Sequence, residues 1–238
     1  MKKQFVEQGE KMRQTSRRHF FGTVAAGATA ISAASLTSFA AGAETLSGQL
    51  YDADDADAWF NQLSGKHKMV FDATQPHDVL PFAWPKVFLL TNGKTAPTDP
   101  EKSVIVVLRH NAIPYAMEDA LWAKYKFGEL FKVTDEVSKT PSVRNPFWKP
   151  KAGDFKVPGI GNVAIGINEL QESGVLFCAC DVAMTVFSAV AAENLKKDPA
   201  DVKKEWVAGL LPGVQKVPSG VWAVGRAQEH GCAYCFAG

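Results

Sequence analysis

Residues 174–187 read GVLFCACDVAMTVF, and this run predicts a buried strand that turns directly into a helix. Val175, Leu176 and Phe177 are apolar residues of strand-forming types. Asp181 is a good N-cap, because its side chain can accept a hydrogen bond from an unpaired amide of the first helical turn. Apolar residues then recur at helical spacing. The run therefore predicts one strand–helix unit of an α/β domain.

Two cysteines, Cys178 and Cys180, stand at the end of this strand. In an open α/β sheet, ligands and chemistry lie beyond the carboxyl ends of the strands. A thiol just before a helix faces unpaired N–H groups and the positive end of the helix dipole, which favour its thiolate. The alternative is that both are small, buried core residues, as free cysteines often are. Their spacing puts both on one face of the strand unless the strand bends.

Strand patterns alternate with helix patterns along the rest of the chain. The β-branched run at residues 103–110 predicts a strand buried on both faces, which is typical of a parallel sheet. We therefore expect an α/β domain with a mostly parallel sheet of four to six strands and helices on both faces. Besides the cysteine strand, the expected strands cover residues 68–72, 103–110 and 214–217, and the expected helices cover residues 79–90, 115–132, 160–172, 198–211 and 221–230.

The segment at residues 133–158 is long, polar and rich in proline. A loop of this length inside a compact domain is usually functional or mobile. Phe147 and Trp148 suggest a lid or a subunit contact, because exposed aromatic residues suit interfaces. We expect the protein to form a homo-oligomer through this segment.

The first 43 residues have the features of an export signal. Residues 16–21 read SRRHFF, which resembles a twin-arginine motif, although Gly22 stands where that motif often has lysine. Residues 19–43 contain no Asp, Glu, Lys or Arg and end in AGA, an A-x-A cleavage site. We expect residues 1–43 to be a twin-arginine signal peptide and residues 44–238 to be one α/β domain, delivered to the periplasm or exported elsewhere. The alternative is an uncleaved N-terminal anchor.

The charge balance excludes some classes of partner. Residues 1–43 hold six basic and two acidic side chains, so the net charge of +1 falls to −3 without them. No basic stripe remains, which argues against nucleic acid as a partner. The mature part has no second long apolar segment, so we expect no membrane attachment after the signal is removed.

Cys232 and Cys235 form a C-x-x-C pair that can hold a redox disulfide or half of a metal site. Four cysteines allow three disulfide pairings, and the sequence does not choose among them. We expect no cofactor; the alternative is a zinc ion held by Cys178, Cys180, Cys232 and Cys235. A helix that follows a parallel strand leads away from the carboxyl edge, so a shared site requires a reversal near Gly231 or a place for the tail in the site of a neighbouring subunit. A local Cys232–Cys235 bridge is the fallback.

Arg109 and His110 follow the strongest strand pattern, where they can add positive charge near a thiolate if the two strands are neighbours. His77 is similarly placed after the first expected strand. A lone histidine at a strand end is also often a hydrogen-bonded structural residue. Residues 159–164 match a dinucleotide fingerprint, but Pro158 precedes them and no buried strand leads into them, which favours a simple turn.

These residues resemble the DsrE/DsrF-like family, whose members have a small α/β fold and relay sulfur as a persulfide on one cysteine. The resemblance rests on residues 174–187, on residues 104–125, and on residues 218–224, which read PSGVWAV. By position, the sulfur-bearing cysteine of that family falls on Cys180, with Cys178 as the second choice. The export signal departs from the cytoplasmic members and leaves their partners in doubt for this chain.

The sequence thus predicts an exported sulfur carrier or sulfurtransferase-like protein. Its site residues would be Cys180, Cys178, Arg109 and His110, and its partner a sulfur-donating small molecule or protein. Whether it has catalytic activity is left open by the sequence. The alternative is a non-enzymatic module that binds a ligand or a partner and whose cysteines are structural, in a disulfide or a zinc site.

Overall fold

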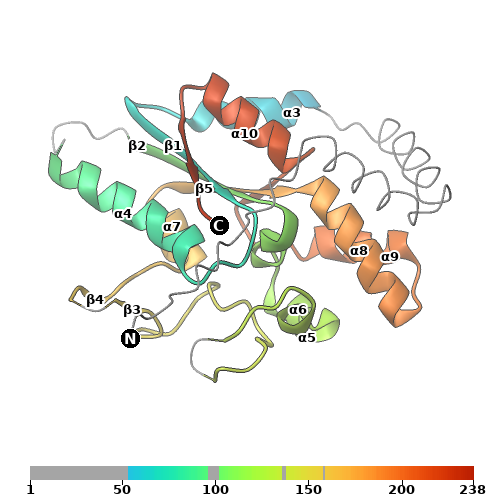
Figure 1. Ribbon diagram of the computed structural model, residues 1–238. Helices are drawn as coiled ribbons and strands as arrows, with labels where there is room; N and C mark the ends of the chain where they lie inside the picture. The colour runs from blue at the N-terminus through green and yellow to red at the C-terminus, as the bar shows by residue number, and fades with distance from the viewer. Residues whose placement is uncertain (1–52, 96–101, 136–137, 158) are drawn as a thin grey trace, which may run out of the picture. The chain divides into compact units, whose positions relative to one another are not determined.

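The computed structural model describes residues 53–95, 102–135, 138–157 and 159–238 (Figure 1). The expected signal peptide and its cleavage site lie outside these residues. A five-stranded sheet forms the centre of the described domain. Its strands are β1 (His67–Ala73), β2 (Lys102–Leu108), β5 (Val175–Cys180), β6 (Val214–Val217) and β7 (Ala233–Phe236), and a separate two-stranded ribbon consists of β3 (Lys156–Val157) and β4 (Gly161–Asn162).

The main sheet has the strand order β6-β5-β2-β1-β7, and every neighbouring pair is parallel. The expected α/β class with a parallel sheet of four to six strands is therefore confirmed. The register places Cys178 opposite Val107, Val107 opposite Asp72, and Asp72 opposite Phe236. Because parallel strands end at a common edge, the residues that follow β1, β2 and β5 gather at one end of the sheet.

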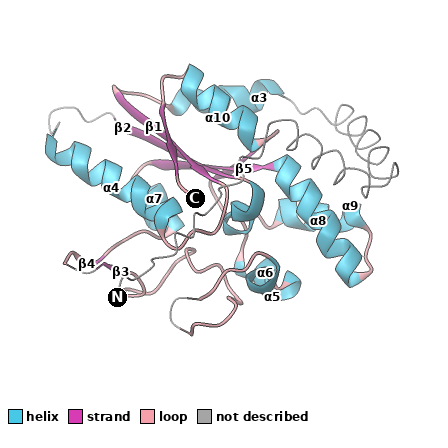
Figure 2. Cartoon of the chain, viewed as in Figure 1, coloured by secondary structure: helices cyan, strands magenta, loops and turns pink. Residues whose placement is uncertain are grey.

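Helices cover both faces of the sheet (Figure 2). One face packs against helices that contribute core residues such as Phe82, Met184 and Trp206. The opposite face packs against a short 3-10 helix and the last α-helix through Phe60 and Ala223. The helices are α3 (Ala53–Ala58), η1 (Trp59–Gln62), α4 (Leu80–Thr95), η2 (His110–Ala116), α5 (Asp119–Tyr125), α6 (Phe127–Leu130), α7 (Ile167–Glu172), α8 (Asp181–Leu195), α9 (Pro199–Ala208) and α10 (Gly220–Glu229).

Several local expectations are corrected. The expected helix at residues 115–132 is split twice. Met117 and Glu118 are extended and separate η2 from α5, and Lys126, which adopts a left-handed conformation with φ of 51°, separates α5 from α6. The expected helix at residues 160–172 is helical only from Ile167, and the dinucleotide-like stretch before it forms the turn of the β3–β4 ribbon. That ribbon is antiparallel, so the stretch lacks the strand–turn–helix context that nucleotide binding requires.

The C-terminal tail forms a strand that sequence patterns did not predict. Gly231 adopts φ of 86° directly after α10 and reverses the chain, so β7 runs parallel to β1 at the edge of the sheet. The carbonyl of Gly238 accepts hydrogen bonds from the amides of Thr74 and Gln75, at 2.7 Å and 3.1 Å. The tail therefore closes one edge of the sheet at the exit of β1.

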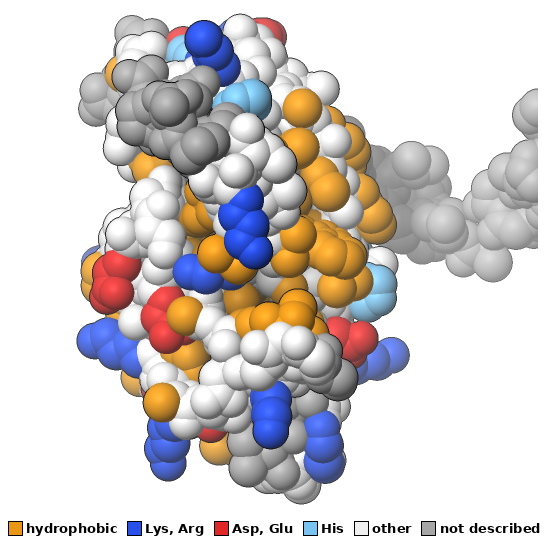
Figure 3. Space-filling model, turned by 90° about the vertical axis from the view of Figure 1, so that its left-hand side faces the viewer, with side chains coloured by type: hydrophobic (Ala, Val, Ile, Leu, Met, Phe, Trp, Pro, Cys, Tyr) orange, Lys and Arg blue, Asp and Glu red, His pale blue; other side chains and the backbone are white. Residues whose placement is uncertain are grey.

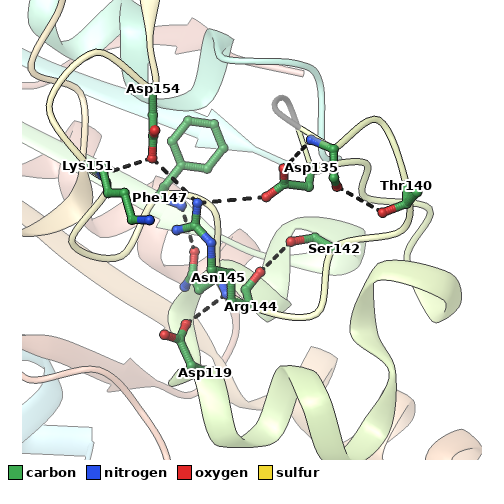
Figure 4. A network of polar contacts seen from close by, with 10 residues as sticks. Asp119, Asp135, Thr140, Ser142, Arg144, Asn145, Phe147, Lys151 and Asp154 are labelled. Carbon is green, nitrogen blue, oxygen red and sulfur yellow. Dashed lines mark hydrogen bonds and ion pairs between the residues drawn. The ribbon is translucent and has the colours of Figure 1, made fainter.

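The long segment at residues 133–158 is folded onto the domain rather than presented as a lid. Asn145 is fully buried and anchors it. Its Nδ2 donates to the carbonyls of Tyr115 and Met117, at 2.8 Å and 2.9 Å. Its Oδ1 accepts a hydrogen bond from the amide of Phe147 at 3.1 Å (Figure 4). The carboxylate of Asp119 accepts a hydrogen bond from the backbone amide of Asn145 at 2.8 Å. This network explains how a polar, proline-bearing segment keeps a defined path.

The aromatic residues of this segment are part of the core. Phe147 is buried and stacks on Phe82, with 4.1 Å between ring centroids, and on Phe155, with 4.8 Å. Trp148 is partly buried and packs against the same core. The expected subunit contact is therefore wrong for Phe147, which the chain itself covers, and stays a prediction for the partly exposed Trp148.

The face that carries α4 shows a gathering of hydrophobic side chains (Figure 3). On α4 itself, Trp84, Val87 and Leu90 are exposed at a spacing of three residues, which places them along one side of the helix. Among the described helices, none combines the length and the apolar composition needed to cross a membrane.

Candidate functional site at Cys180

Cys180 is the last residue of β5 and the N-cap of α8. Its Sγ accepts a hydrogen bond from the backbone amide of Ala183 at 3.3 Å. The expectation that Asp181 caps this helix is wrong, because Asp181 is already the first helical residue and the sulfur takes the capping role. The thiol therefore sits directly on the amide end of a 15-residue helix.

A second helix begins at the same sulfur. Gly220 is the first residue of α10, and its backbone amide acts on Cys180 together with the amides of Ala183 and Val182. All three amides lower the pKa of the thiol. Two helix N-termini thus face one sulfur atom, and such termini favour negative charge.

Burial opposes these amides. Only 6% of the surface of Cys180 is exposed, and this desolvation is the largest influence on the pKa of its thiol, which is raised despite the three amides. The adjacent charge of Asp181 raises the pKa further. The expected low pKa is therefore corrected: the resting thiol is protonated at neutral pH, and the site supplies stabilisation for an anion that forms on the sulfur.

Arg109 lies at the same end of the sheet and is bound to Asp72 of β1. Its Nε and Nη2 donate to the two carboxylate oxygens of Asp72, at 2.6 Å and 2.8 Å. The pKa of Arg109 is raised, chiefly by this hydrogen bond and to a smaller extent by the charge of Cys180. The predicted proximity of Arg109 to the thiol is therefore present, with its charge shared by Asp72.

The carboxylate of Asp181 lies on the other side of Cys180. It is buried and receives the ammonium group of Lys203 from α9 at 2.7 Å, on Oδ2. The ammonium group of Lys216 from β6 lies 4.0 Å from Oδ1, which accepts no hydrogen bond from any described residue. The charge next to the thiol is thus compensated by two lysines.

His110 is placed differently from the expectation. It is exposed, has φ of 50°, and its ring packs edge-to-face on Phe187 of α8, with 5.9 Å between centroids. Within the described residues, no hydrogen bond joins His110 to Cys180. His77 is also exposed. The two histidines therefore lie at the carboxyl edge, and a role for His110 beside the thiol stays a prediction.

Cys178 is a core residue. It is fully buried, among Val107 and Val217 on the α10 side of the sheet. Burial strongly raises the pKa of its thiol, and the charges of Cys180 and Asp72 raise it further. Of the two cysteines of β5, only Cys180 reaches the edge where a second molecule can approach.

The cysteines of the tail do not join this site. Cys235 lies on β7, which is separated from β5 by β1 and β2. Three strand spacings amount to about 14 Å, twice the Cα separation that a disulfide tolerates. All four cysteines are free thiols, and no group of three or more potential metal ligands is found within the described residues. The shared four-cysteine zinc site and the Cys232–Cys235 bridge are therefore wrong for this structure.

Burial also raises the pKa of the two tail thiols. The pKa of Cys232 is raised to about 11 by burial, against a smaller lowering by the charge of Lys68. The pKa of Cys235 is raised for the same reason. Neither thiol has the helix amides that surround Cys180.

A cavity of about 270 Å³ opens at the carboxyl edge beyond β1 and β2. It lies between the loop that follows β1 and the segment that follows α6, and Asn111 next to His110 forms part of its wall. The lining residues are Gln75, Pro76, Asn111, Leu130, Phe131 and Lys132.

Sequence reasoning missed Asp72, Gly220 and Tyr234. Asp72 ends an apolar strand pattern, where an acidic residue signals a strand end as readily as a buried ion pair. Gly220 was read only as part of the lead into the last helix. Tyr234 was given no role at the site, yet its hydroxyl donates to Asp72 at 3.0 Å.

No protein-family model matches the chain, and no curated protein matches it. A similar solved structure is that of MTH1491 from Methanobacterium thermoautotrophicum, a protein of unknown function. It has 17% sequence identity and a TM-score of 0.36, and the match covers 72% of this chain and 99% of that chain. Likeness at this level says nothing about the chemistry of Cys180.

Proposed function

We propose that the protein is a thiol-based sulfur carrier or sulfurtransferase-like protein in which Cys180 holds sulfane sulfur as a persulfide. The observation that carries the proposal is the convergence of two helix N-termini, those of α8 and α10, on the Cys180 sulfur. The resemblance of residues 174–187 to the DsrE/DsrF-like family and the twin-arginine-like motif support an exported member of that family.

The proposed step is a sulfur transfer without net oxidation. The Cys180 thiolate attacks the outer sulfur of a persulfide or thiosulfate donor. A new S–S bond forms at Sγ while the S–S bond of the donor breaks, and the donor leaves as a thiolate or as sulfite. The amides of Ala183 and Gly220 stabilise the negative charge that stays on the extended sulfur group.

The raised pKa of the resting thiol fits this role. A buried, protonated thiol resists adventitious oxidation, because the thiolate is the reactive species. The three backbone amides stabilise the anion that forms on the Cys180 sulfur when the thiol loses its proton.

Intact-mass spectrometry after incubation with thiosulfate or inorganic polysulfide tests the proposal. We expect the protein to gain the mass of one sulfur atom, and a reducing agent to remove it. Cys180→Ser abolishes the gain, whereas Cys235→Ser, which removes a partly exposed thiol outside the site, serves as the matched control and keeps it. Uptake at an unchanged level in Cys180→Ser refutes the assignment.

A non-enzymatic binding module is the second candidate, and the raised pKa of every cysteine favours it. Thiols that are only structural react slowly in the folded protein. A thiol count before and after denaturation separates the two candidates: reaction of Cys180 in the native protein, at a rate that increases with pH, favours the carrier. No reaction before unfolding favours the binding module.

A homo-oligomer is part of the proposal. The stripe of Trp84, Val87 and Leu90 on α4 supports it better than the buried residues of segment 133–158 do. Light scattering at micromolar concentration tests it, and a mass equal to that of one chain excludes it.

A further inference from the structure

Asp72 forms a buried ion pair at the same edge of the sheet as Cys180. Only 2% of its surface is exposed, and its carboxylate binds the guanidinium of Arg109 through two hydrogen bonds of 2.6 Å and 2.8 Å. The hydroxyl of Tyr234, on β7, donates to Oδ2 at 3.0 Å. Residues from β1, β7 and the end of β2 therefore meet at one carboxylate.

Packing alone does not account for a charge at this position. Asp72 lies between Val107 and Phe236 in the register of the sheet, and Val70 two residues earlier is part of the apolar core. Withdrawal of a carboxylate from water costs several kcal/mol, and a buried ion pair is often no more stabilising than apolar residues of similar volume. The pair therefore calls for a role other than stability.

The link from this pair to Cys180 runs through the stem of Arg109. A Cβ atom added at Gly220 would lie 2.5 Å from Cβ and 2.6 Å from Cδ of Arg109. The first turn of α10 thus rests on the Arg109 stem, with no space for a side chain between them. The position of Arg109 accordingly sets the position of the Gly220 amide, which acts on the Cys180 sulfur.

We propose that Asp72 is a positioning residue that acts on Cys180 through Arg109, and that Tyr234 of the C-terminal strand completes this arrangement. Asp72 occupies Nε and Nη2 of Arg109, which leaves Nη1 outside the pair for an incoming anion. The substrate class that fits is an anionic sulfane-sulfur donor, and this part rests on the sulfur-carrier function proposed above.

The experiment measures the alkylation rate of Cys180 by iodoacetamide as a function of pH, with the modified residue located by peptide mass spectrometry. Asp72→Asn puts an amide N–H against the guanidinium and so releases Arg109. We expect the pH midpoint of alkylation to rise by about one unit, a tenfold lower rate at neutral pH, because the Gly220 amide loses its placement. A purely electrostatic role predicts the opposite sign, since removal of a nearby negative charge lowers the pKa of a thiol. A lower midpoint in Asp72→Asn therefore overturns the proposal.

Tyr234→Phe provides a milder variant that keeps the ion pair and removes one hydrogen bond. We expect a shift in the same direction and about a third as large, with an unchanged circular dichroism spectrum. If Asp72→Asn does not fold, this variant decides the outcome, and no shift in Tyr234→Phe counts against the proposal.

A double-mutant cycle tests the route of the effect. Once Arg109→Met has removed the guanidinium, Asp72→Asn should change the alkylation midpoint by less than about 0.3 units, because it has no partner left to position. Additive effects mean that Asp72 acts by another route, and the proposal is then wrong.

The readout also separates this proposal from the proposed function. Alkylation needs no sulfur donor, so a shifted midpoint in a protein that takes up no sulfur supports the positioning role and refutes the carrier. If the wild type takes up sulfur and Asp72→Asn leaves the alkylation midpoint of Cys180 unchanged, the carrier is supported and the positioning role is refuted.

Discussion

Gly220→Ala is a single-methyl change that probes the contact on which the site depends. Gly220 is buried, and its new Cβ would lie 2.5–3.0 Å from three carbon atoms of the Arg109 stem. These atoms are not the free end of a flexible side chain, because Asp72 holds the guanidinium. Either the first turn of α10 or Arg109 has to move.

The magnitude follows from the cost of an extra carbon in a packed site, about 1–3 kcal/mol. Gly225→Ala is the matched control, since it lies in the same helix and a Cβ there meets nothing within 4 Å. Alanine in place of glycine inside a helix stabilises by about 0.5–1 kcal/mol. The same glycine-to-alanine change should therefore lower the stability of the protein at position 220 and raise it at position 225.

Urea unfolding and thermal melting measure this difference. A gap of about 2 kcal/mol between the two variants corresponds to about 4–8 °C in melting temperature for a chain of this size. Gly220→Ala should also slow the alkylation of Cys180, and Gly225→Ala should leave it unchanged. Equal stability of the two variants, with the same alkylation rate at Cys180, refutes the argument that Gly220 and Arg109 set each other's positions.

Three further predictions concern the core and its thiols. Asn145→Ala should destabilise the protein by about 3 kcal/mol or more in urea unfolding, because two carbonyls and one amide lose their partner. A loss of stability below about 1 kcal/mol contradicts the conclusion that Asn145 anchors segment 133–158. Cys178 should resist iodoacetamide in the native state at pH 8 and react only after unfolding. Stability should fall as the pH rises above about 9, because the raised pKa of Cys178 means that the folded state holds a proton that the unfolded state releases. Cys178→Ala should weaken this dependence, and an unchanged slope of stability against pH in that variant argues against it.

Four of the five strands of the main sheet were predictable from local signals, and only β7 was missed. Residues 103–110 form a continuous β-branched run, and Asp198-Pro199 is a helix start that depends only on neighbouring residues. The strand–cysteine–helix unit was likewise visible in residues 174–187. Such features need no knowledge of distant parts of the chain.

The chemistry of the site depends on distant pairings that the sequence does not display. Asp72 meets Arg109 across 37 residues and Tyr234 across 162 residues. The sign of the pKa shift at Cys180 depends on how much water the fold removes, which a single helix N-terminus does not reveal. The split of the expected helix at Lys126 was missed because lysine is a good helix former, and tertiary packing overrides that preference.

The pairing of β7 with β1 has a consequence for the order in which the fold is completed. Met69 pairs with Ala233, so the contact has to close a loop that contains nearly the whole domain. Contacts of such high order form late and slowly. A nascent chain that has already made β6 still presents one bare edge of β1, and an unpaired edge is a template for association with another chain. The strand that supplies Tyr234 to the Asp72 carboxylate is thus also the one that covers this edge of β1, and it then forms the edge of the sheet itself.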